Sequence, residues 1–206
     1  MKRLGLTFLT MLMLVWGCGQ ETPQQNVAEA SAEEAAEIVP LGSQAATMLM
    51  DSLKAALSAA IIAGGPAHAI DICNLQAMPL TAEIAQSLPG EVQIKRTSFK
   101  YRNPANAPDD VETAALHYFA AKADAGAELP GHYVQKVSEN GAVYFNYYQP
   151  LRTAGLCLTC HGDRETMDDN LKAALAARYP QDLATGYGEG DFRGVIKVQI
   201  EPESDQ

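Results

Sequence analysis

The residues best suited to chemistry stand close together late in the chain, at Cys157, Cys160 and His161. Two cysteines separated by two residues and followed directly by a histidine form the attachment pattern for c-type haem. The spacing suits this reaction because two thiols must reach the two vinyl groups on one porphyrin edge, while the adjoining imidazole binds the iron from one face. We therefore predict one covalently bound haem c, with thioether bonds at both cysteines and His161 as the proximal iron ligand.

Two other chemistries use the same residue types. A Cys-x-x-Cys pair alone can form a redox-active or structural disulfide. Here a histidine follows the second cysteine directly, and the preceding residues 151–155 have the composition of a loop rather than of the strand in a thioredoxin motif. A zinc site would need four ligands in two pairs, and the sequence offers no second Cys/His pair. Haem attachment is therefore the better interpretation.

The N-terminus has the pattern of a bacterial export signal. Lys2-Arg3 precedes an apolar stretch from Leu4 to Trp16, which is too short for a comfortable transmembrane helix. This stretch runs into Val15-Trp16-Gly17-Cys18, which resembles a lipobox. We predict a signal peptide over residues 1–17, cleavage before Cys18 and lipid attachment to that cysteine. A plain secretory cleavage or an uncleaved anchor is the alternative.

The residue after the predicted lipidation site bears on location. Gly19, rather than an aspartate, follows it, and by analogy with bacterial lipoprotein sorting this favours the outer membrane over the inner one. Attachment of c-type haem in bacteria also takes place outside the cytoplasm, so the export signal and the haem motif agree. The expected location is the periplasmic side of a bacterial membrane, with the protein anchored through its N-terminal lipid.

The chain is acidic, with 15 Lys and Arg against 25 Asp and Glu and a net charge of -10 over 206 residues. Such a protein should not bind nucleic acid, because that affinity depends on neutralising phosphates. A basic electron-transfer or signalling protein is a compatible partner. The hydrophobic content of 47% is ordinary for one globular domain.

Hydrophobic periodicity predicts an α+β domain over residues 41–206, preceded by a disordered polar tether over residues 18–40. A long helix over 43–63 should end at Gly64-Gly65-Pro66. Further helices are expected over 66–76, 81–87, 109–124 and 168–177, and strands over 92–98, 132–138, 142–148 and 194–200. Glu139-Asn140-Gly141 is a strong hairpin signal between the middle two strands. Helices first and antiparallel strands afterwards indicate an α+β layout with one sheet covered on a face.

Several short stretches, spread in order along the chain, resemble the Tll-type single-haem c-type cytochrome domain family, which occurs alone and on bacterial sensor proteins. They are Gly64-Gly65-Pro66, Ala69-Ile70, Cys73-Asn74, Arg96-Thr97-Ser98, Arg102-Asn103-Pro104, Asn106-Ala107-Pro108-Asp109, Cys157 to Gly162, Tyr179-Pro180 and Gly190-Asp191-Phe192-Arg193-Gly194. The resemblance implies a PAS-like antiparallel sheet that holds one covalent haem, with a cysteine opposite the proximal histidine.

Cys73 matches that cysteine, so the resemblance implies that its thiolate is the second iron ligand. This gives a role to a cysteine that would otherwise be left over in an exported protein. Iron must then displace a proton from a thiol whose ordinary pKa is about 8.5. The residues alone would leave the second ligand open among other side chains, namely His68, His117, His132, Met48, Met50, Met78 and Met167.

Basic residues gather unusually between positions 95 and 102. Arg96 and Arg102 are either solvated or contact the two haem propionates, where guanidinium makes paired hydrogen bonds. Arg193 is a third candidate for the propionates. Lys95 and Lys100 are expected on a solvated strand face and loop.

A histidine below the iron and a thiolate above it leave no open position for a substrate. We therefore predict electron transfer or redox sensing without enzymatic activity. In the alternative, a gas or ligand sensor, Cys73 leaves the iron on reduction and the signal passes to a separate protein. A peroxidase-like enzyme is less favoured because it needs an open distal site with acid–base groups.

Overall fold

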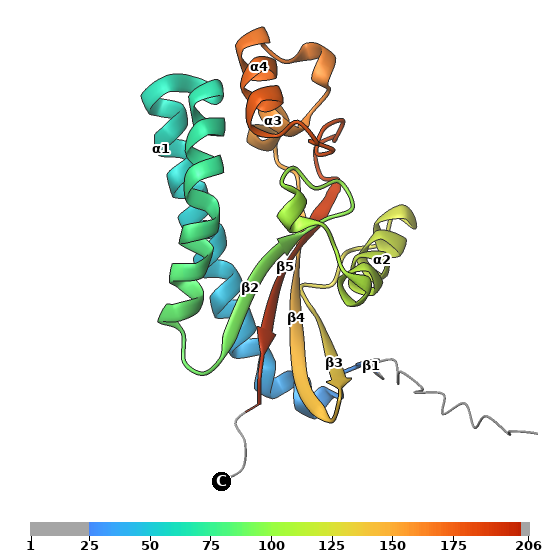
Figure 1. Cartoon of the computed structure of the whole chain (residues 1–206). Coiled ribbons are helices and arrows are strands. Elements are labelled where there is room, and N and C mark those ends of the chain that lie inside the picture. The colour runs from blue at the N-terminus through green and yellow to red at the C-terminus, as the bar shows by residue number, and fades with distance from the viewer. Residues whose placement is uncertain (1–24, 203–206) are drawn as a thin grey trace, which may run out of the picture.

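The computed structural model of the protein describes residues 25–202, so the expected signal peptide and Cys18 lie outside the described residues. The strands are β1 (Gln25–Glu29), β2 (Val92–Thr97), β3 (Tyr133–Glu139), β4 (Ala142–Arg152) and β5 (Phe192–Ile200). The helices are α1 (Ala32–Ser87), α2 (Asp110–Asp124), α3 (Leu158–His161) and α4 (Asp169–Arg178), with short 3-10 turns η1 (Pro104–Asn106), η2 (Gly155–Cys157) and η3 (Arg164–Thr166). Figure 1 shows that α3 and α4 lie at one end of the sheet, beside the tip of α1.

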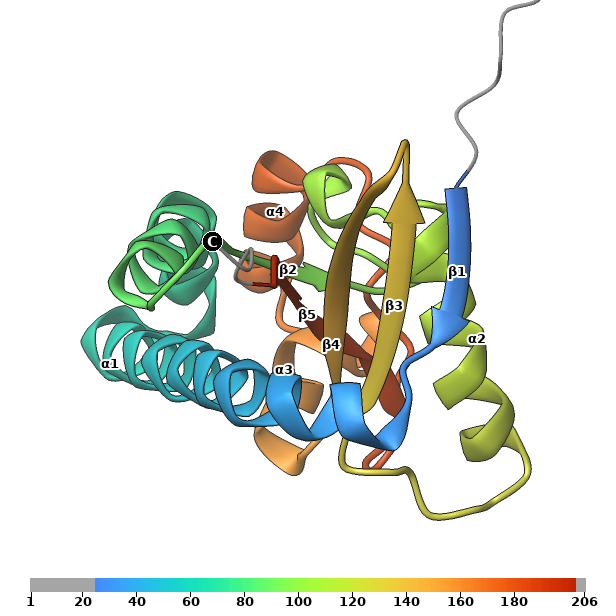
Figure 2. The same cartoon turned by 90° about the horizontal axis from the view of Figure 1, so that it is seen from below.

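The strands form one five-stranded sheet in the order β1-β3-β4-β5-β2, and every neighbouring pair is antiparallel. Helices α1 and α2 lie on opposite faces of this sheet (Figure 2). Neighbours in one strand serve the two faces alternately, as strand geometry requires: Tyr147 packs on the α1 side and Tyr148 on the α2 side. The α+β fold and the PAS-like antiparallel sheet expected from the sequence are confirmed.

Helix α1 is a hairpin of two arms. Gly65 breaks the helical geometry with φ 78° and ψ -177°, a combination that is open essentially only to glycine, and the second arm then runs back beside the first (Figure 1). The predicted break is therefore confirmed. The separate helices expected over 66–76 and 81–87 are in fact one arm, which continues through Pro79 because Ala77, Thr81 and Ile84 are buried. By length and composition alone α1 could cross a membrane.

The tether expected over residues 18–40 is wrong for the part that the structure describes. Residues 25–29 form β1, which pairs with β3, and α1 begins at Ala32 with a capping box between Ser31 and Glu34. The polar composition does not indicate a strand here, because β1 is an edge strand whose residues are all exposed and which is held by backbone hydrogen bonds rather than by an apolar face. The folded domain thus begins near residue 25 rather than at 41.

Local signals in the rest of the chain predicted its elements well. Helix α2 begins after Asp109, which caps it in a capping box with Glu112. Asn140 and Gly141 both have positive φ, 52° and 86°, as a two-residue hairpin turn requires. Asp168 caps α4 through the backbone N–H of Asn170.

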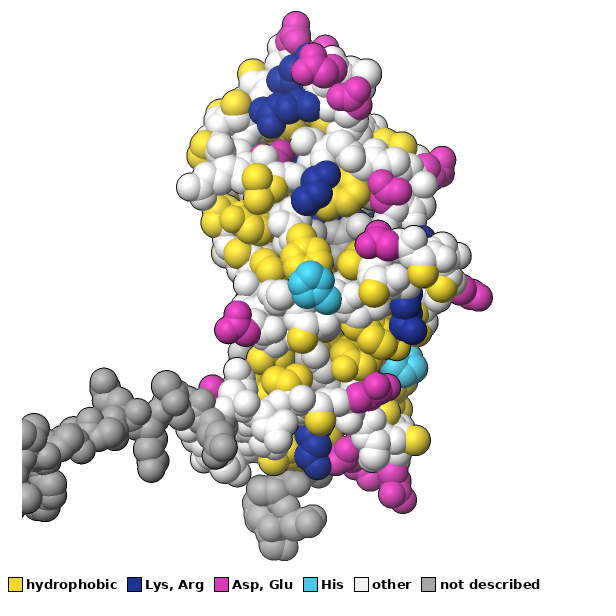
Figure 3. Space-filling model, turned by 90° about the vertical axis from the view of Figure 1, so that its right-hand side faces the viewer, with side chains coloured by type: hydrophobic (Ala, Val, Ile, Leu, Met, Phe, Trp, Pro, Cys, Tyr) yellow, Lys and Arg dark blue, Asp and Glu magenta, His cyan; other side chains and the backbone are white. Residues whose placement is uncertain are grey.

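The acidic character of the chain is visible on its surface. On the face drawn in Figure 3, Asp and Glu side chains are spread from one end to the other, with Lys and Arg side chains between them. On that face the negative charge is therefore distributed rather than gathered into a single site.

Candidate functional site

A cavity of ≈ 280 Å³ opens between the second arm of α1, the end of β2, the loop after it and the α3 turn. Its wall brings together all the residues that the sequence suggests for the haem, which are Cys73, Arg96, Arg102, Cys157, Cys160, His161 and the third propionate candidate, Arg193. Much of the remaining wall is apolar, formed by Leu53, Leu57, Ile61, Ile70, Leu151, Leu156 and Val195. The site thus has an apolar interior, three thiols, one imidazole and guanidinium groups.

The attachment motif forms two consecutive tight turns. Cys157 closes η2, and its backbone N–H donates to the carbonyl of Ala154 at 2.8 Å. Cys160 and His161 lie three and four residues further on, in the single turn of α3. Residues at this spacing lie on one side of a helical turn, which explains why all three side chains reach the same cavity.

His161 is oriented by a backbone carbonyl. Its Nδ1 lies 2.7 Å from the carbonyl oxygen of Ala184, so Nδ1 carries the proton and donates it, and Nε2 keeps a free lone pair. Burial lowers the pKa of His161 to about 3, and the nearby charges of Arg102 and Arg193 act in the same direction. The imidazole is therefore neutral, as a metal ligand must be.

Cys73 comes from a different part of the chain, the second arm of α1, and is half-buried. Burial raises the pKa of the Cys73 thiol, while the positive charges of Arg96 and Arg102 oppose that rise. Within residues 25–202 the cysteines are all free.

Most of the other candidates for the second iron ligand lie away from the cavity. Among the histidines and methionines considered from the sequence, Met78 alone lines the cavity. His117 packs against Phe99 and His132 against Tyr147, with ring centroids 4.8 and 5.7 Å apart. Geometry therefore reduces the choice for a second ligand to Cys73 and Met78.

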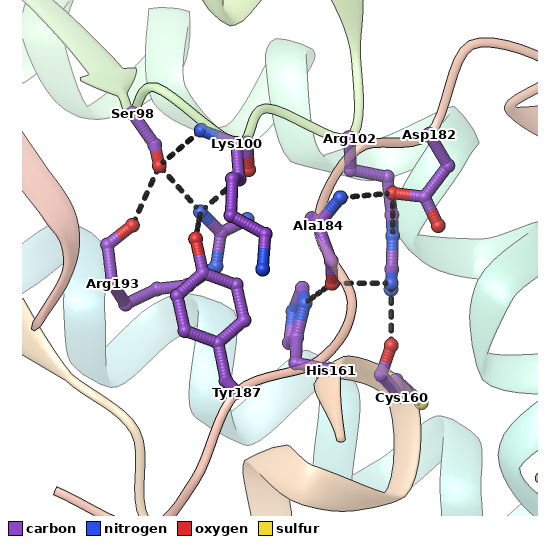
Figure 4. Close-up of polar contacts among 9 residues, drawn as sticks. All are labelled: Ser98, Lys100, Arg102, Cys160, His161, Asp182, Ala184, Tyr187 and Arg193. Atoms are coloured by element: carbon purple, nitrogen blue, oxygen red, sulfur yellow. Dashed lines mark hydrogen bonds and ion pairs between the residues drawn. The ribbon is translucent and has the colours of Figure 1, made fainter. Parts of the chain in front are cut away.

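The two arginines predicted for the propionates differ. Arg102 is occupied by protein groups: its Nε donates to Asp182 Oδ1 at 3.2 Å, and its Nη2 donates to the carbonyls of Cys160 and Ala184 (Figure 4). The side chain of Arg96 has no hydrogen bond or ion pair with any described residue, although it lines the cavity and burial lowers the pKa of its guanidinium. Arg96 is therefore the one of the two that is free to meet an anionic group.

Arg193, the third candidate, also lines the cavity. Its Nη1 donates to Ser98 Oγ at 2.8 Å and to the carbonyl of Lys100 at 2.9 Å, and its guanidinium lies 5.1 Å from the ring centroid of Tyr187. The same ring contacts Lys100 Nζ at 4.2 Å (Figure 4). Lys100 is therefore packed on an aromatic ring rather than solvated as expected.

The solvated position expected for Lys95 is also wrong. Lys95 Nζ lies 2.6 Å from the fully buried carboxylate of Glu112, on the opposite face of the sheet. The charge pattern predicted a solvated face because the carboxylate partner lies in another element, 17 residues away in the chain.

Sequence reasoning missed the supports of the histidine, which are Asp182, Ala184 and Tyr187. Tyr187 donates its backbone N–H to the carbonyl of His161 at 3.0 Å and places its ring edge-on to the imidazole. The only available signal was the family-like stretch at 179–180 and 190–194, which flanks these residues without containing them.

Taken together, these groups suit a flat, largely apolar ligand that carries carboxylates and a metal. The apolar wall would cover its faces, His161 Nε2 and a Cys73 thiolate would bind the metal, and Arg96 would meet a carboxylate. Two thiols in the α3 turn could hold one edge of it covalently. The residues present therefore fit a haem.

Comparison with known proteins agrees with this geometry. The chain is similar to a solved structure described as the crystal structure of the cyanobacterial heme-protein Tll0287, with a TM-score of 0.56 and 25% sequence identity, over 86% of this chain and 99% of the other. No curated protein sequence matches it. The model of the Tll0287-like family matches residues 24–201, which is nearly the whole described domain, and this chain therefore belongs to the Tll0287-like family.

Proposed function

We propose that this protein is an exported domain with a single covalent c-type haem, which takes part in electron transfer or redox sensing. The observation that carries the proposal is the convergence of Cys157, Cys160, His161, Cys73 and Arg96 on one cavity, although they come from three separate parts of the chain. The description of the similar structure as a heme-protein supports the same cofactor here.

When bound, the haem would supply an iron that accepts and returns one electron. Cys157 and Cys160 would hold it covalently, and His161 would bind through Nε2 because Nδ1 is engaged with Ala184. Cys73, from the second arm of α1, would supply a thiolate as the second iron ligand. Arg96 neutralises a propionate, since it lacks a counter-ion among the described residues.

Ligation from both sides favours a carrier or a sensor over an enzyme, because no position is left for a substrate. One observation favours a sensor as the second candidate. Cys73 lies on the helix arm that follows the break at Gly65, and that arm is joined to α4 by an ion pair between Asp71 and Arg178 at 2.6 Å. On one-electron reduction by a donor protein, Cys73 would leave the iron and take up a proton, and the arm would relax and signal to a separate partner.

The location and partners that we propose are based on sequence patterns. The N-terminal export pattern supports a lipid-anchored protein on the periplasmic side of a bacterial membrane, with the outer membrane favoured. The net charge of -10 supports a basic protein partner and argues against nucleic acid.

Covalent attachment is tested by producing the full chain in a bacterium with a working haem-attachment system. We expect the denatured, acid–acetone-extracted protein to keep its colour and the added mass of one haem, measured by mass spectrometry and a pyridine haemochrome spectrum. The Cys157→Ala/Cys160→Ala variant is the control that should lose both. A wild-type protein with neither colour nor added mass would contradict the proposal.

The second ligand is tested by Cys73→Ala, with Met78→Leu as the matched control on the same wall. Cys73→Ala should keep the covalent haem but change the ferric absorption and electron-spin spectra and raise the reduction potential, because a thiolate donates charge that stabilises ferric iron. Met78→Leu should leave the spectra unchanged. The reverse result would assign the iron to Met78.

Carrier and sensor differ in what the reduced protein does. Fast electron self-exchange without binding of carbon monoxide favours a carrier. Slow exchange with binding of carbon monoxide favours a sensor, because Cys73 must then have left the iron.

A further inference from the structure

Arg102 joins three segments that are far apart in the chain. From the loop after β2, its guanidinium reaches the carbonyl of Cys160 in the α3 turn, the side chain of Asp182 and the carbonyl of Ala184. The side chains of Arg102 and Asp182 are only 13% and 1% exposed. A buried ion pair of this kind contributes little net stability by itself, so its position beside the attachment motif calls for another role.

The Ala184 carbonyl is where these bonds meet. It accepts a hydrogen bond from His161 Nδ1 at 2.7 Å and from Arg102 Nη2 at 3.3 Å. The backbone N–H of the same residue donates to Asp182 Oδ1 at 2.8 Å, and that oxygen also accepts from Arg102 Nε (Figure 4). The hydrogen-bond partner of the proximal histidine is thus held on both sides by the pair of Arg102 and Asp182.

We propose that Arg102, held by Asp182, is a positioning residue that fixes the Ala184 carbonyl against His161 and so sets the orientation and electron donation of the proximal ligand. This inference rests on the proposed haem function. It assigns Arg102 to the support of the histidine instead of the propionates, because two of its three nitrogens are already bonded to protein oxygens.

The shared carbonyl also indicates in which direction the loss of Arg102 should shift the reduction potential. A guanidinium that donates to the same oxygen withdraws electron density from it, so the oxygen accepts less strongly from His161 and the imidazole stays a weaker electron donor. Removal of Arg102 should strengthen donation by the imidazole and also remove a positive charge near the iron. Both effects favour ferric iron, so the reduction potential should fall.

The test compares haem-loaded wild-type protein with Arg102→Met, Arg102→Lys and the double variant Arg102→Met/Asp182→Asn. The double variant removes both members of the ion pair, which leaves no unpaired buried carboxylate if Arg102→Met alone folds poorly. Arg164→Met is the matched control, since Arg164 is exposed, lies three residues after His161 and has no side-chain bond to another described residue. The readouts are the Nδ1–H signal and hydrogen-exchange rate of His161 by ¹⁵N-labelled NMR of the reduced protein, the reduction potential, and the covalent haem content.

We expect equal haem content in all variants, with a shifted Nδ1–H signal and a changed exchange rate in Arg102→Met and in the double variant. The potential should fall in Arg102→Met, and it should fall less in the double variant, which loses one charge of each sign. Arg102→Lys should restore the potential in part, because it returns the charge, but not the Nδ1–H signal, because an ammonium cannot span the three acceptors. Wild-type Nδ1–H behaviour in the double variant would overturn the positioning role. Absence of covalent haem from the wild-type protein would instead overturn the proposed function, so the two failures are distinct.

Discussion

Lys95 and Arg96 are neighbours on β2, yet their side chains lie on opposite faces of the sheet and in different electrostatic environments. Lys95 points to the α2 side, where its Nζ lies 2.6 Å from Glu112 Oε2 and 2.8 Å from the carbonyl of Ala107. Lys197 completes the group, with its Nζ 2.9 Å from Glu112 Oε1. Arg96 lines the cavity on the other side and has no carboxylate partner among residues 25–202.

Strand alternation explains the separation, because successive side chains point to opposite faces of a sheet. A charge taken out of water is costly unless it is paired. On the α2 side the chain supplies the partner itself, so that group stabilises the fold. On the cavity side the described residues supply none for Arg96, which suits a place where a ligand brings the negative charge. Of these two adjacent residues, Lys95 carries a charge that stabilises the fold, and Arg96 carries a charge that is available to a ligand.

The largest effect on stability should come from replacing Glu112, the buried carboxylate on the α2 side of the sheet. Burial alone would raise the pKa of Glu112, but its bonds to Lys95 and Lys197 outweigh this and hold the pKa below its ordinary value, so the carboxylate is charged. Glu112→Ala leaves two ammonium groups without their carboxylate partner and should lower the free energy of unfolding by about 3–5 kcal/mol. Urea denaturation followed by circular dichroism measures the loss, which should be the same with and without haem.

Glu128→Ala removes an exposed carboxylate from the chain after α2 and is the control for Glu112→Ala. It should change the free energy of unfolding by less than about 0.5 kcal/mol. If Glu112→Ala also cost less than about 1 kcal/mol, the buried group would not have the structural role assigned to it.

The features that could be predicted from the sequence are those decided by nearby residues. The attachment motif, the break at Gly65, the hairpin at Asn140 and Gly141 and the cap of α2 at Asp109 all depend on residues within one turn of each other. Each has a local physical cause, either a backbone geometry open to few residue types or an unsatisfied N–H that needs an acceptor.

The features that could not be predicted depend on distant partners. β1 has no apolar face, and it is a strand only because β3, more than 100 residues later, offers its edge. Arg96 and Arg102 have the same side chain and the same apparent claim to a propionate. They differ because Asp182, which lies 80 residues beyond Arg102, binds Arg102 and not Arg96. No pattern within one segment contains that information.

The sharpest test of the comparison uses Arg96→Met and Lys95→Met, each in two backgrounds: the haem-carrying protein and the Cys157→Ala/Cys160→Ala variant without attached haem. If Arg96 is the partner of a propionate, its replacement should cost about 1–3 kcal/mol of unfolding free energy with haem, the range for a hydrogen bond to a charged group. Without haem it should change stability by less than about 0.5 kcal/mol, because no protein contact is lost.

Lys95→Met should be destabilising by a similar amount in both backgrounds, since its carboxylate partner belongs to the chain. The difference between backgrounds isolates the coupling of each residue to the haem, as in a double-mutant cycle. Equal losses for Arg96→Met in the two backgrounds would mean that its partner lies within the protein, and the distinction between the two neighbours on β2 would then fail.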